Sequence, residues 1–250
     1  MMLPAPFRWE RRGRIDSSND EARRLALAGA GHGTVVTAVE QSAGRGRRGR
    51  PWLSPAGNLH CSVLLDPGED PAAAPQLAFV AALALRDALA ELAVTGDFRV
   101  KWPNDILCNG AKIAGMLLER VGALIILGVG VNIVAFPENA LFPATCLRKL
   151  GSGANEEDVL SGFCTRLGAR YDQWRREGFA PIREAWLAVA AGLGREITAR
   201  LADETVLQGV FAGLDRDGAL QLAGEGGAIH RVLAGDVFFG RNGGRDAAGD

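Results

Sequence analysis

Arginine alternates with glycine in one short segment of the chain, Gln41-Ser-Ala-Gly-Arg-Gly-Arg-Arg-Gly-Arg50, which Pro51 and Trp52 follow. Glycine lets a backbone N–H group come close to an anion, and a guanidinium group pairs with phosphate or carboxylate oxygens through two hydrogen bonds at once. The formal net charge of the whole chain is only −1. The segment therefore predicts a local anion site rather than a generally basic protein.

The flanking sequence indicates how this segment is held. In isolation such a run is also typical of a disordered nucleic-acid-binding segment or of a solvated turn. Here apolar stretches enclose it, Thr34 to Val39 before it and Leu59 to Leu65 after it, and such stretches are typical of strands. We therefore expect a loop between two strands, and we expect the part from Ala43 to Pro51 to be mobile until a ligand orders it, since it has little to bury.

A second polar cluster, Asp16-Ser-Ser-Asn19, stands directly before a helix-forming stretch at 21–28 that ends at Gly29. Hydroxyl, carboxylate and amide side chains at this position cap the first N–H groups of a helix. The start of the helix is then suited to an anion or a carbonyl group. Capping alone would also explain these residues, and both roles can hold together.

A third cluster begins at Lys101-Trp-Pro-Asn-Asp105 and ends at Lys112. Between its two parts, Asn109-Gly110 predicts a tight hairpin turn. On a purely structural interpretation, Lys112 is an exposed lysine at the end of a strand, and the polar residues after Pro103 only form a turn.

The remaining pattern predicts an α+β protein, in which a mixed sheet carries helices and a small β-barrel follows. Apolar residues recur at helical spacing from Leu77 to near Gly96 and from Leu160 to Trp174, and a shorter helix follows. The stretch from Ala123 to Asn132 is apolar on both faces, so we expect a strand in the middle of a covered sheet. In all, we expect strands at 34–39, 59–65, 99–102, 112–119 and 123–132, helices at 21–28, 77–95, 160–174 and 181–193, and barrel strands at 196–201, 206–214, 219–222 and 229–239.

Composition sets the class of protein. With 250 residues, 48% hydrophobic and 23% charged, the chain can bury a large core. We expect one catalytic domain at 1–194, a barrel at 195–240 and a flexible tail at 241–250. Charged residues interrupt the longest apolar stretch, and the N-terminus lacks the apolar core of a signal peptide, which favours a cytoplasmic protein with no membrane contact. The four cysteines have no metal-type spacing and are typical of reduced thiols: Cys61, Cys108, Cys146 and Cys164.

Taken together and in this order, the three clusters resemble the bacterial biotin–protein ligase family. The resemblance covers nearly the whole chain and includes the stretch from Gly209 to Leu222, which is similar to the family's SH3-like domain. The matching motifs are Asp16-Ser-Ser-Asn19, Gln41 to Trp52 with Ser54-Pro55, Lys101-Trp-Pro-Asn-Asp105, Lys112-Ile-Ala-Gly115 with Glu119, and Gly128-Val-Gly-Val-Asn-Ile133.

The resemblance implies a catalytic domain of the class II aminoacyl-tRNA synthetase and biotin ligase type. It implies a reaction in two steps, in which biotin and MgATP give biotinyl-5′-AMP and pyrophosphate, and a lysine of a biotin carboxyl carrier domain then takes the biotinyl group. The cofactors implied are ATP, biotin and Mg²⁺. Family members can pair as homodimers through a sheet edge.

The resemblance also assigns residues. Lys112, Arg47 and Arg45 would be catalytic, and Asp105 would bind Mg²⁺. Trp52 would cover the ligand, although a tryptophan that only packs in the core would give the same sequence pattern. Biotin would contact Ser17, Ser18, Asn19, Gln41, Gly44, Arg45, Lys112, Gly115, Leu117 and Gly130. The nucleotide would contact Arg47, Arg48, Arg50, Trp52, Lys101, Asn104, Asp105 and Asn132.

Two departures and two alternatives bear on function. Ser18 stands where many relatives carry threonine, and the hydroxyl is kept. Only about fifteen residues precede Asp16, too few for the helix-turn-helix domain of relatives that also repress transcription, so we expect no nucleic-acid partner. A lipoate–protein ligase would share the fold but should show a histidine-aspartate pair after its arginine-glycine segment, which this sequence lacks. A phosphate-clamping nucleic-acid-binding protein is the second alternative.

Overall fold

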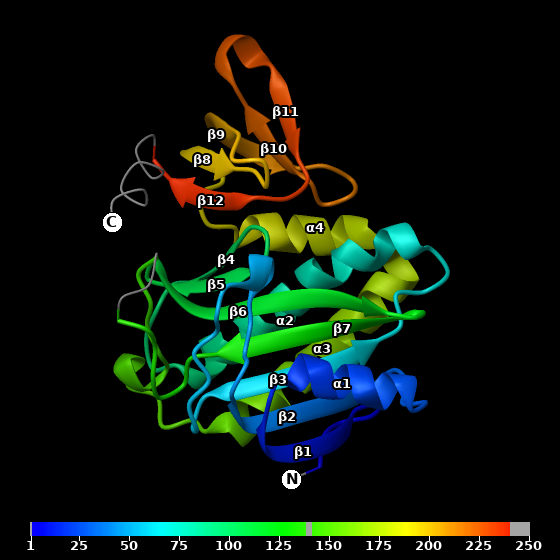
Figure 1. Ribbon diagram of the computed structural model, residues 1–250. Coiled ribbons are helices and arrows are strands. Elements are labelled where there is room, and N and C mark those ends of the chain that lie inside the picture. The colour runs from blue at the N-terminus through cyan, green and yellow to red at the C-terminus, as the bar shows by residue number, and fades with distance from the viewer. Residues whose placement is uncertain (1, 139–141, 241–250) are drawn as a thin grey trace.

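Seven strands form a mixed sheet in the computed structural model, which describes residues 2–138 and 142–240 (Figure 1). The strand order is β1-β2-β3-β7-β6-β5-β4, with β1 parallel to β2 and every other neighbouring pair antiparallel. The bounds are β1 (Arg8–Ile15), β2 (Thr34–Gln41), β3 (Leu59–Leu65), β4 (Phe98–Lys101), β5 (Asp105–Cys108), β6 (Ala111–Val121) and β7 (Leu124–Val131).

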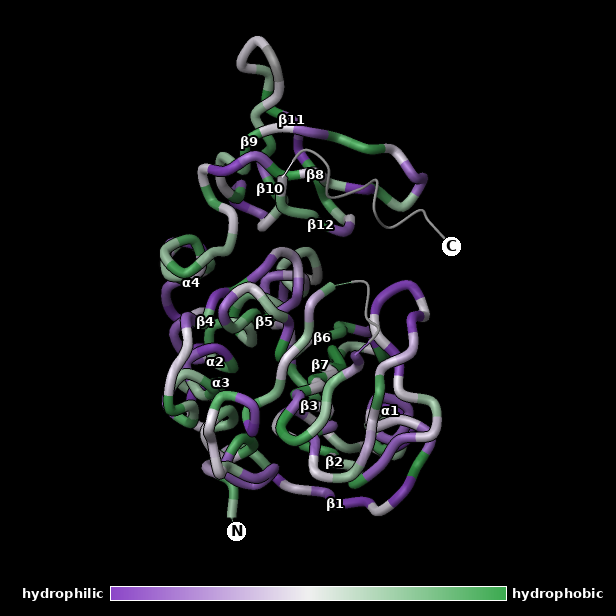
Figure 2. Tube along the Cα trace, turned by 90° about the vertical axis from the view of Figure 1, so that its left-hand side faces the viewer, coloured by the Kyte–Doolittle hydropathy of each residue, from purple (hydrophilic) through white to green (hydrophobic). Residues whose placement is uncertain are grey.

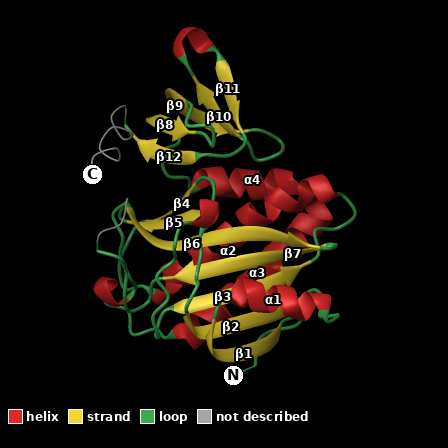
Figure 3. Ribbon diagram, viewed as in Figure 1, coloured by secondary structure: helices red, strands yellow, loops and turns green. Residues whose placement is uncertain are grey.

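Helices cover both faces of this sheet. The helix α1 (Ser18–Leu27) lies on one face, and α2 (Leu77–Leu92) and α3 (Glu156–Glu177) lie on the other (Figure 3). Neighbouring residues of a strand point to opposite faces, so Val63 joins the core under α2 and α3 while Leu64 packs under α1. The prediction that the 123–132 strand is central and covered is confirmed, because β7 is the fourth of the seven strands and is buried along most of its length.

A second, five-stranded antiparallel sheet follows the helix α4 (Phe179–Ala188). Figure 2 shows it beyond α4, apart from the larger sheet. Its order is β11-β10-β9-β8-β12, and a tight turn at Asp217-Gly218 joins β9 to β10. The bounds are β8 (Glu196–Arg200), β9 (Val206–Leu214), β10 (Leu220–Ala223), β11 (Ile229–Val232) and β12 (Asp236–Phe239).

The structure differs from the sequence-based elements in several places, among them α4, which ends at Ala188 and not at 193. The strand β1 was not expected, since its sequence RWERRGRI lacks an apolar run and lies at an exposed sheet edge. Asp105 was expected in a turn and no strand was expected at 106–108, but residues 105–108 form β5. The expected strand at 229–239 is divided into β11 and β12. The helix α3 begins earlier than its apolar stripe because Asn155 and Asp158 form a capping box. The tail at 241–250 lies outside the described residues, and the domain boundaries stay predictions.

One stretch among the described residues, Ala72–Leu92, is long and apolar enough to cross a membrane by length and composition. Of its apolar window, 61% is buried inside the protein. Most of the stretch is α2, which supplies fully buried side chains such as Leu77, Leu85 and Leu89 to the core beneath the sheet. Its apolar character is therefore explained by packing.

Candidate active site

A cavity of about 680 Å³ opens between the larger sheet and the second sheet. The start of α1, the loop at 41–54, the ends of β4 to β7, the segment after β7 and the first residues of β12 surround it. All three polar clusters of the sequence meet there. Every predicted site residue lines the cavity except Arg48.

Glycines form part of the floor. At Gly130 of β7 a Cβ atom would collide with the indole ring of Trp52, and at Gly128 it would collide with the side chain of Asn19. Both positions therefore exclude any larger residue while these neighbours stay in place. Bare backbone here lets the Trp52 ring and the Asn19 side chain lie directly on the strand, and these side chains bound the space for a ligand.

The start of α1 forms one polar wall. Ser17 caps the helix, since its Oγ accepts a hydrogen bond from the Asn19 backbone N–H at 3.2 Å. The Ser18 backbone N–H donates to Gln41 Oε1 at 2.7 Å, and the Asn19 Nδ2 donates to Glu119 Oε2 at 3.0 Å. These side chains are ordered by one another, so the wall is built before any ligand binds.

Ser62 supports this wall without lining the cavity, and the sequence analysis did not identify it. Its Oγ lies 2.8 Å from Ser18 Oγ and 2.6 Å from Asn19 Oδ1, and the residue is fully buried. A serine within the apolar stretch 59–65 was the available signal, because a buried hydroxyl requires a partner. Glu119 was part of a quoted motif without a role, and it accepts hydrogen bonds from both Asn19 and Arg45.

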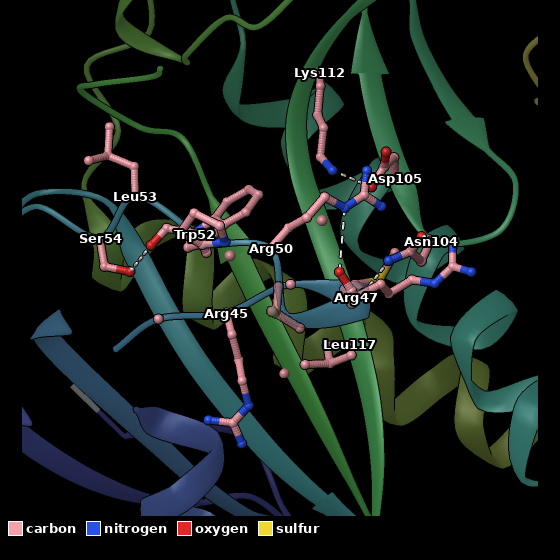
Figure 4. A pocket seen from close by; sticks show the side chains of 18 of the residues that line it. Arg45, Arg47, Arg50, Trp52, Leu53, Ser54, Asn104, Asp105, Lys112 and Leu117 are labelled. Atoms are coloured by element: carbon pink, nitrogen blue, oxygen red, sulfur yellow. Dashed lines mark hydrogen bonds and ion pairs between the residues drawn. The ribbon is translucent and has the colours of Figure 1, made fainter. Parts of the chain in front are cut away.

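Arg45 points away from the other cations of the cavity and toward α1 (Figure 4). Its guanidinium donates two hydrogen bonds of 2.7 Å to the carboxylate of Asp20 and lies 3.3 Å from Glu119. The bonds to Asp20 raise the pKa of Arg45 and lower that of Asp20. This charge holds the loop to α1, and in this conformation it is not directed at the space near Lys112.

The other loop arginines converge on one carboxylate of the second sheet, Asp236. Arg50 donates to its Oδ1 at 2.8 Å, Arg48 to its Oδ2 at 3.5 Å, and Arg47 lies 3.9 Å from it. Arg47 also donates to the Gly235 carbonyl at 3.1 Å, and burial lowers its pKa. Arg48 turns out of the cavity, where it donates to the Leu201 carbonyl at 2.8 Å. The segment 44–50 is thus tied to the second sheet.

Two lysines stand in contrasting surroundings. Lys112 Nζ lies 2.6 Å from Asp105 Oδ1 and above the floor at Gly115, where a Cβ atom would stand 3.3 Å from it (Figure 4). Lys101 is 5% exposed, and within the described residues no carboxylate forms an ion pair with it. Its Nζ lies 3.8 Å from the ring centroid of Phe142, and burial lowers its pKa to about 8.

Known proteins share this architecture and sequence. The Biotin/lipoate A/B protein ligase family matches residues 13–132, and the Biotin protein ligase C terminal domain matches residues 192–240. A protein of Paracoccus denitrificans named biotin–[acetyl-CoA-carboxylase] ligase is 43% identical over 91% of this chain and 98% of its own length. The chain belongs to the biotin protein ligase family.

Other relatives of the ligase are similar over the same region. A bifunctional ligase/repressor of Bacillus subtilis is 34% identical over 90% of this chain and 72% of its own length. The structure of the Aquifex aeolicus biotin protein ligase in complex with biotin and ATP has a TM-score of 0.83, with 28% identity over 93% of this chain and 99% of that one. The predicted α+β fold with its small terminal barrel is therefore confirmed, and so is the predicted family.

Proposed function

We propose that the ligase activates biotin with MgATP in this cavity, forming biotinyl-5′-AMP and pyrophosphate, and then passes the biotinyl group to a lysine of a biotin carboxyl carrier domain. The observation that carries this assignment is the position of Lys112. On one side of its ammonium lie the glycine floor and the polar wall at the start of α1. On the other side lie the cations around Asp105 and Asp236. A carboxylate bound over the floor would meet a phosphate bound among the cations at that point.

Biotin would lie over the glycine floor. Its ureido ring needs both donors and acceptors in a small apolar pocket, since burying it without partners would be costly. Ser17, Ser18, Asn19 and Gln41 offer these groups, while Gly115, Leu117 and Gly130 form the apolar surface. The backbone of Gly44 and Arg45 would close the pocket beside the ureido ring. This role needs only the backbone of Arg45, whose guanidinium is bonded to Asp20.

The triphosphate would lie among Arg47, Arg50, Lys101 and Asn104. In the first step a biotin carboxylate oxygen attacks the α-phosphorus, and the bond from that phosphorus to the bridging oxygen breaks to release pyrophosphate. Negative charge grows on the phosphate oxygens, so fixed cations near them lower the barrier. In the second step the acceptor amine attacks the acyl carbon, loses its proton and expels AMP. Asn132 borders the same space, and Trp52 would cover the mixed anhydride.

The residues fit a magnesium ion that takes most of its ligands from phosphate and water. Protein sites for Mg²⁺ commonly use one or two carboxylates together with substrate phosphates. Asp105 supplies one such carboxylate, and the described residues contain no cluster of three or more metal-binding side chains. The ion would neutralise phosphate charge, and Asp105 would hold it while also orienting Lys112.

The partners follow from the same chemistry. A lysine on a protruding turn of a carrier domain could enter the mouth of the cavity. The absence of a nucleic-acid partner stays a prediction. A homodimer could form along β1, which lies at the sheet edge. Four buried free thiols agree with a cytoplasmic location.

The direct test is incubation of the protein with biotin, MgATP and a purified carrier domain, followed by mass spectrometry of the carrier. We expect a gain of one biotinyl group that depends on ATP. Lipoate in place of biotin, with its own carrier, serves as the control for the related activity. No mass gain with biotin, or a larger gain with lipoate, would contradict the assignment.

A further inference from the structure

Asn58, directly before β3, holds three consecutive backbone groups with one side-chain atom. Its Oδ1 accepts hydrogen bonds from the N–H groups of Ile133, Val134 and Ala135 at 2.9, 2.9 and 3.1 Å. Its Nδ2 donates to the Ala135 carbonyl at 2.8 Å, and the residue is 2% exposed. Successive N–H groups that point at one centre form a concave site for an anionic or carbonyl oxygen. Here a side chain of the protein fills that site.

Residues on both sides of the three clamped residues line the active site. Just before them Asn132 lines the cavity, and beyond them Pro137 and Phe142 line it too. Phe142 is the ring that stands 3.8 Å from the Lys101 ammonium. The positions of Asn132 and Pro137 relative to the proposed phosphate site therefore depend on how the residues between them are held.

The far end of the same segment is bonded to the backbone of Lys112. The Lys112 N–H donates to the Pro143 carbonyl at 2.7 Å, and the Thr145 N–H donates to the Lys112 carbonyl at 2.9 Å. The Asn132 Nδ2 in turn donates to the Thr145 carbonyl at 3.1 Å, which ties the two ends together. A shift of residues 133–135 would thus be felt at Lys112, through Asn132 and Thr145.

The clamp also joins two walls of the cavity. The turn that carries Asn58 directly follows Ser54, the last residue of the arginine loop that lines the cavity. At Gly57, which has a φ of 88°, a Cβ atom would stand 2.9 Å from Val134 Cγ2, so the turn is seated closely on the clamped segment. Asn58 itself does not line the active-site cavity.

We propose that Asn58 is a positioning residue for the nucleotide side of the active site, acting through residues 132–135 and Thr145 on the backbone of Lys112. This inference rests on the proposed function. It assigns no contact between Asn58 and either substrate. Biotin recognition at the start of α1 is built from other elements and should not depend on it.

The test compares Asn58→Ala with wild type in steady-state adenylation. Removal of the carboxamide leaves three buried N–H groups without an acceptor, and the segment should move to solvate them. We expect the KM for ATP to rise by about tenfold, with a smaller loss in kcat, while biotin affinity measured by calorimetry stays within twofold of wild type. Asn58→Gln keeps the amide but displaces it by one methylene, and the same result is expected from it should Asn58→Ala not fold.

Ser152→Ala is the matched control. Ser152 is 7% exposed, and its Oγ donates to the Leu92 carbonyl and accepts from the Ala154 N–H, away from the cavity. We expect this variant to lose stability without a change in either substrate constant. An unchanged KM for ATP in the folded Asn58 variants, an equal weakening of biotin and ATP, or an equal effect of Ser152→Ala would overturn the positioning role. If the proposed function itself were wrong, the wild-type protein would not label the carrier, so the two failures can be told apart.

Discussion

At the scale of single residues, the active site separates two lysines by their surroundings. The Lys112 Nζ forms an ion pair with Asp105 Oδ1 at 2.6 Å, and this pair fixes the ammonium over the glycine floor. Lys101 is enclosed by apolar groups and faces the ring of Phe142. A paired lysine keeps its position before the reaction, whereas a buried unpaired lysine attracts an anion strongly because little water screens it. We therefore expect different defects when each is changed.

Lys112→Ala should slow adenylate formation far more than it destabilises the fold. The variant removes a charge-assisted contact to the transferring phosphate, and such losses raise the barrier by roughly 2–4 kcal/mol. Lys112→Arg should also be impaired, because a planar guanidinium does not replace a compact ammonium. Pyrophosphate exchange measures the step. Lys149→Ala, which removes an exposed lysine, is the control, and exchange in Lys112→Ala within tenfold of wild type would refute the role.

Lys101 should make ATP binding sensitive to pH near 8. Burial lowers its pKa to about 8, so the free enzyme loses this charge as the pH rises through that value, and the KM for ATP should increase. Between pH 8 and about 10.4 the unfolded chain keeps the proton that the native state has lost, so the contribution of Lys101 to stability rises with pH in that window. The Lys101→Arg variant stays charged in this range, so its KM for ATP should not change as the pH passes 8. A wild-type profile that is flat across pH 8 would argue against it.

At the scale of elements, the arginine loop is held from two sides. Arg45 ties its start to Asp20 of α1, and the arginines around the short helix η1 (Arg47–Gly49) tie its end to Asp236 of β12. The sequence suggested a loop without an apolar anchor, and the structure supplies ionic anchors instead. Whether a ligand orders the loop further stays a prediction. The carboxylate of Asp236 pairs with these arginines beside the proposed triphosphate site, so it can hold the loop closed over the cavity.

Asp236→Asn should loosen this closure and let the adenylate escape. The neutral amide loses the ionic attraction to Arg47, Arg48 and Arg50, and the loop should open more often. We expect several-fold more biotin on an unrelated lysine-rich protein mixed with enzyme, ATP and biotin, and Arg47→Gly should act in the same direction. Asp217→Asn, in an exposed ion pair of the same sheet, should match wild type. Unchanged labelling together with unchanged release of free adenylate would show that the ion pairs of Asp236 are not needed to retain the adenylate.

At the scale of the whole molecule, the two sheets share one core. The hydrophobic cluster beneath the larger sheet continues through Phe79 and Trp186 into Phe211 and Leu222 of the second sheet. The Trp102 indole N–H donates to the Gly218 carbonyl at 3.2 Å, and Phe79 packs edge-on against Phe179 at 5.3 Å. Since Asp236 and Val237 also line the cavity, neither sheet completes the site alone.

This shared core predicts that the protein unfolds in one transition. Separating the sheets would expose aromatic side chains of both, so partial unfolding should be unfavourable relative to complete unfolding. Scanning calorimetry should give a single peak whose calorimetric and van't Hoff enthalpies agree, provided that refolding is reversible. Two resolved peaks, with the smaller one removed by truncation after Gly194, would show that the sheets are independent.

The sequence by itself was enough for the residue clusters, most helices and strands, the order of the two sheets along the chain, and the family. Periodicity, capping and turn signals act over a few residues, and they place Ser17 at a helix start and the Asn109-Gly110 turn directly before the strand β6. Only the tertiary structure decided which partner each charge meets. Arg50 and Asp236 are 186 positions apart, and Asn58 lies 75 positions from the first amide that it clamps. No local pattern encodes such pairs, because they depend on the register of strands and on the packing of one sheet against another. The direction of Arg45, the exclusion of Arg48 from the cavity and the role of Asp236 could therefore be determined only from the folded chain.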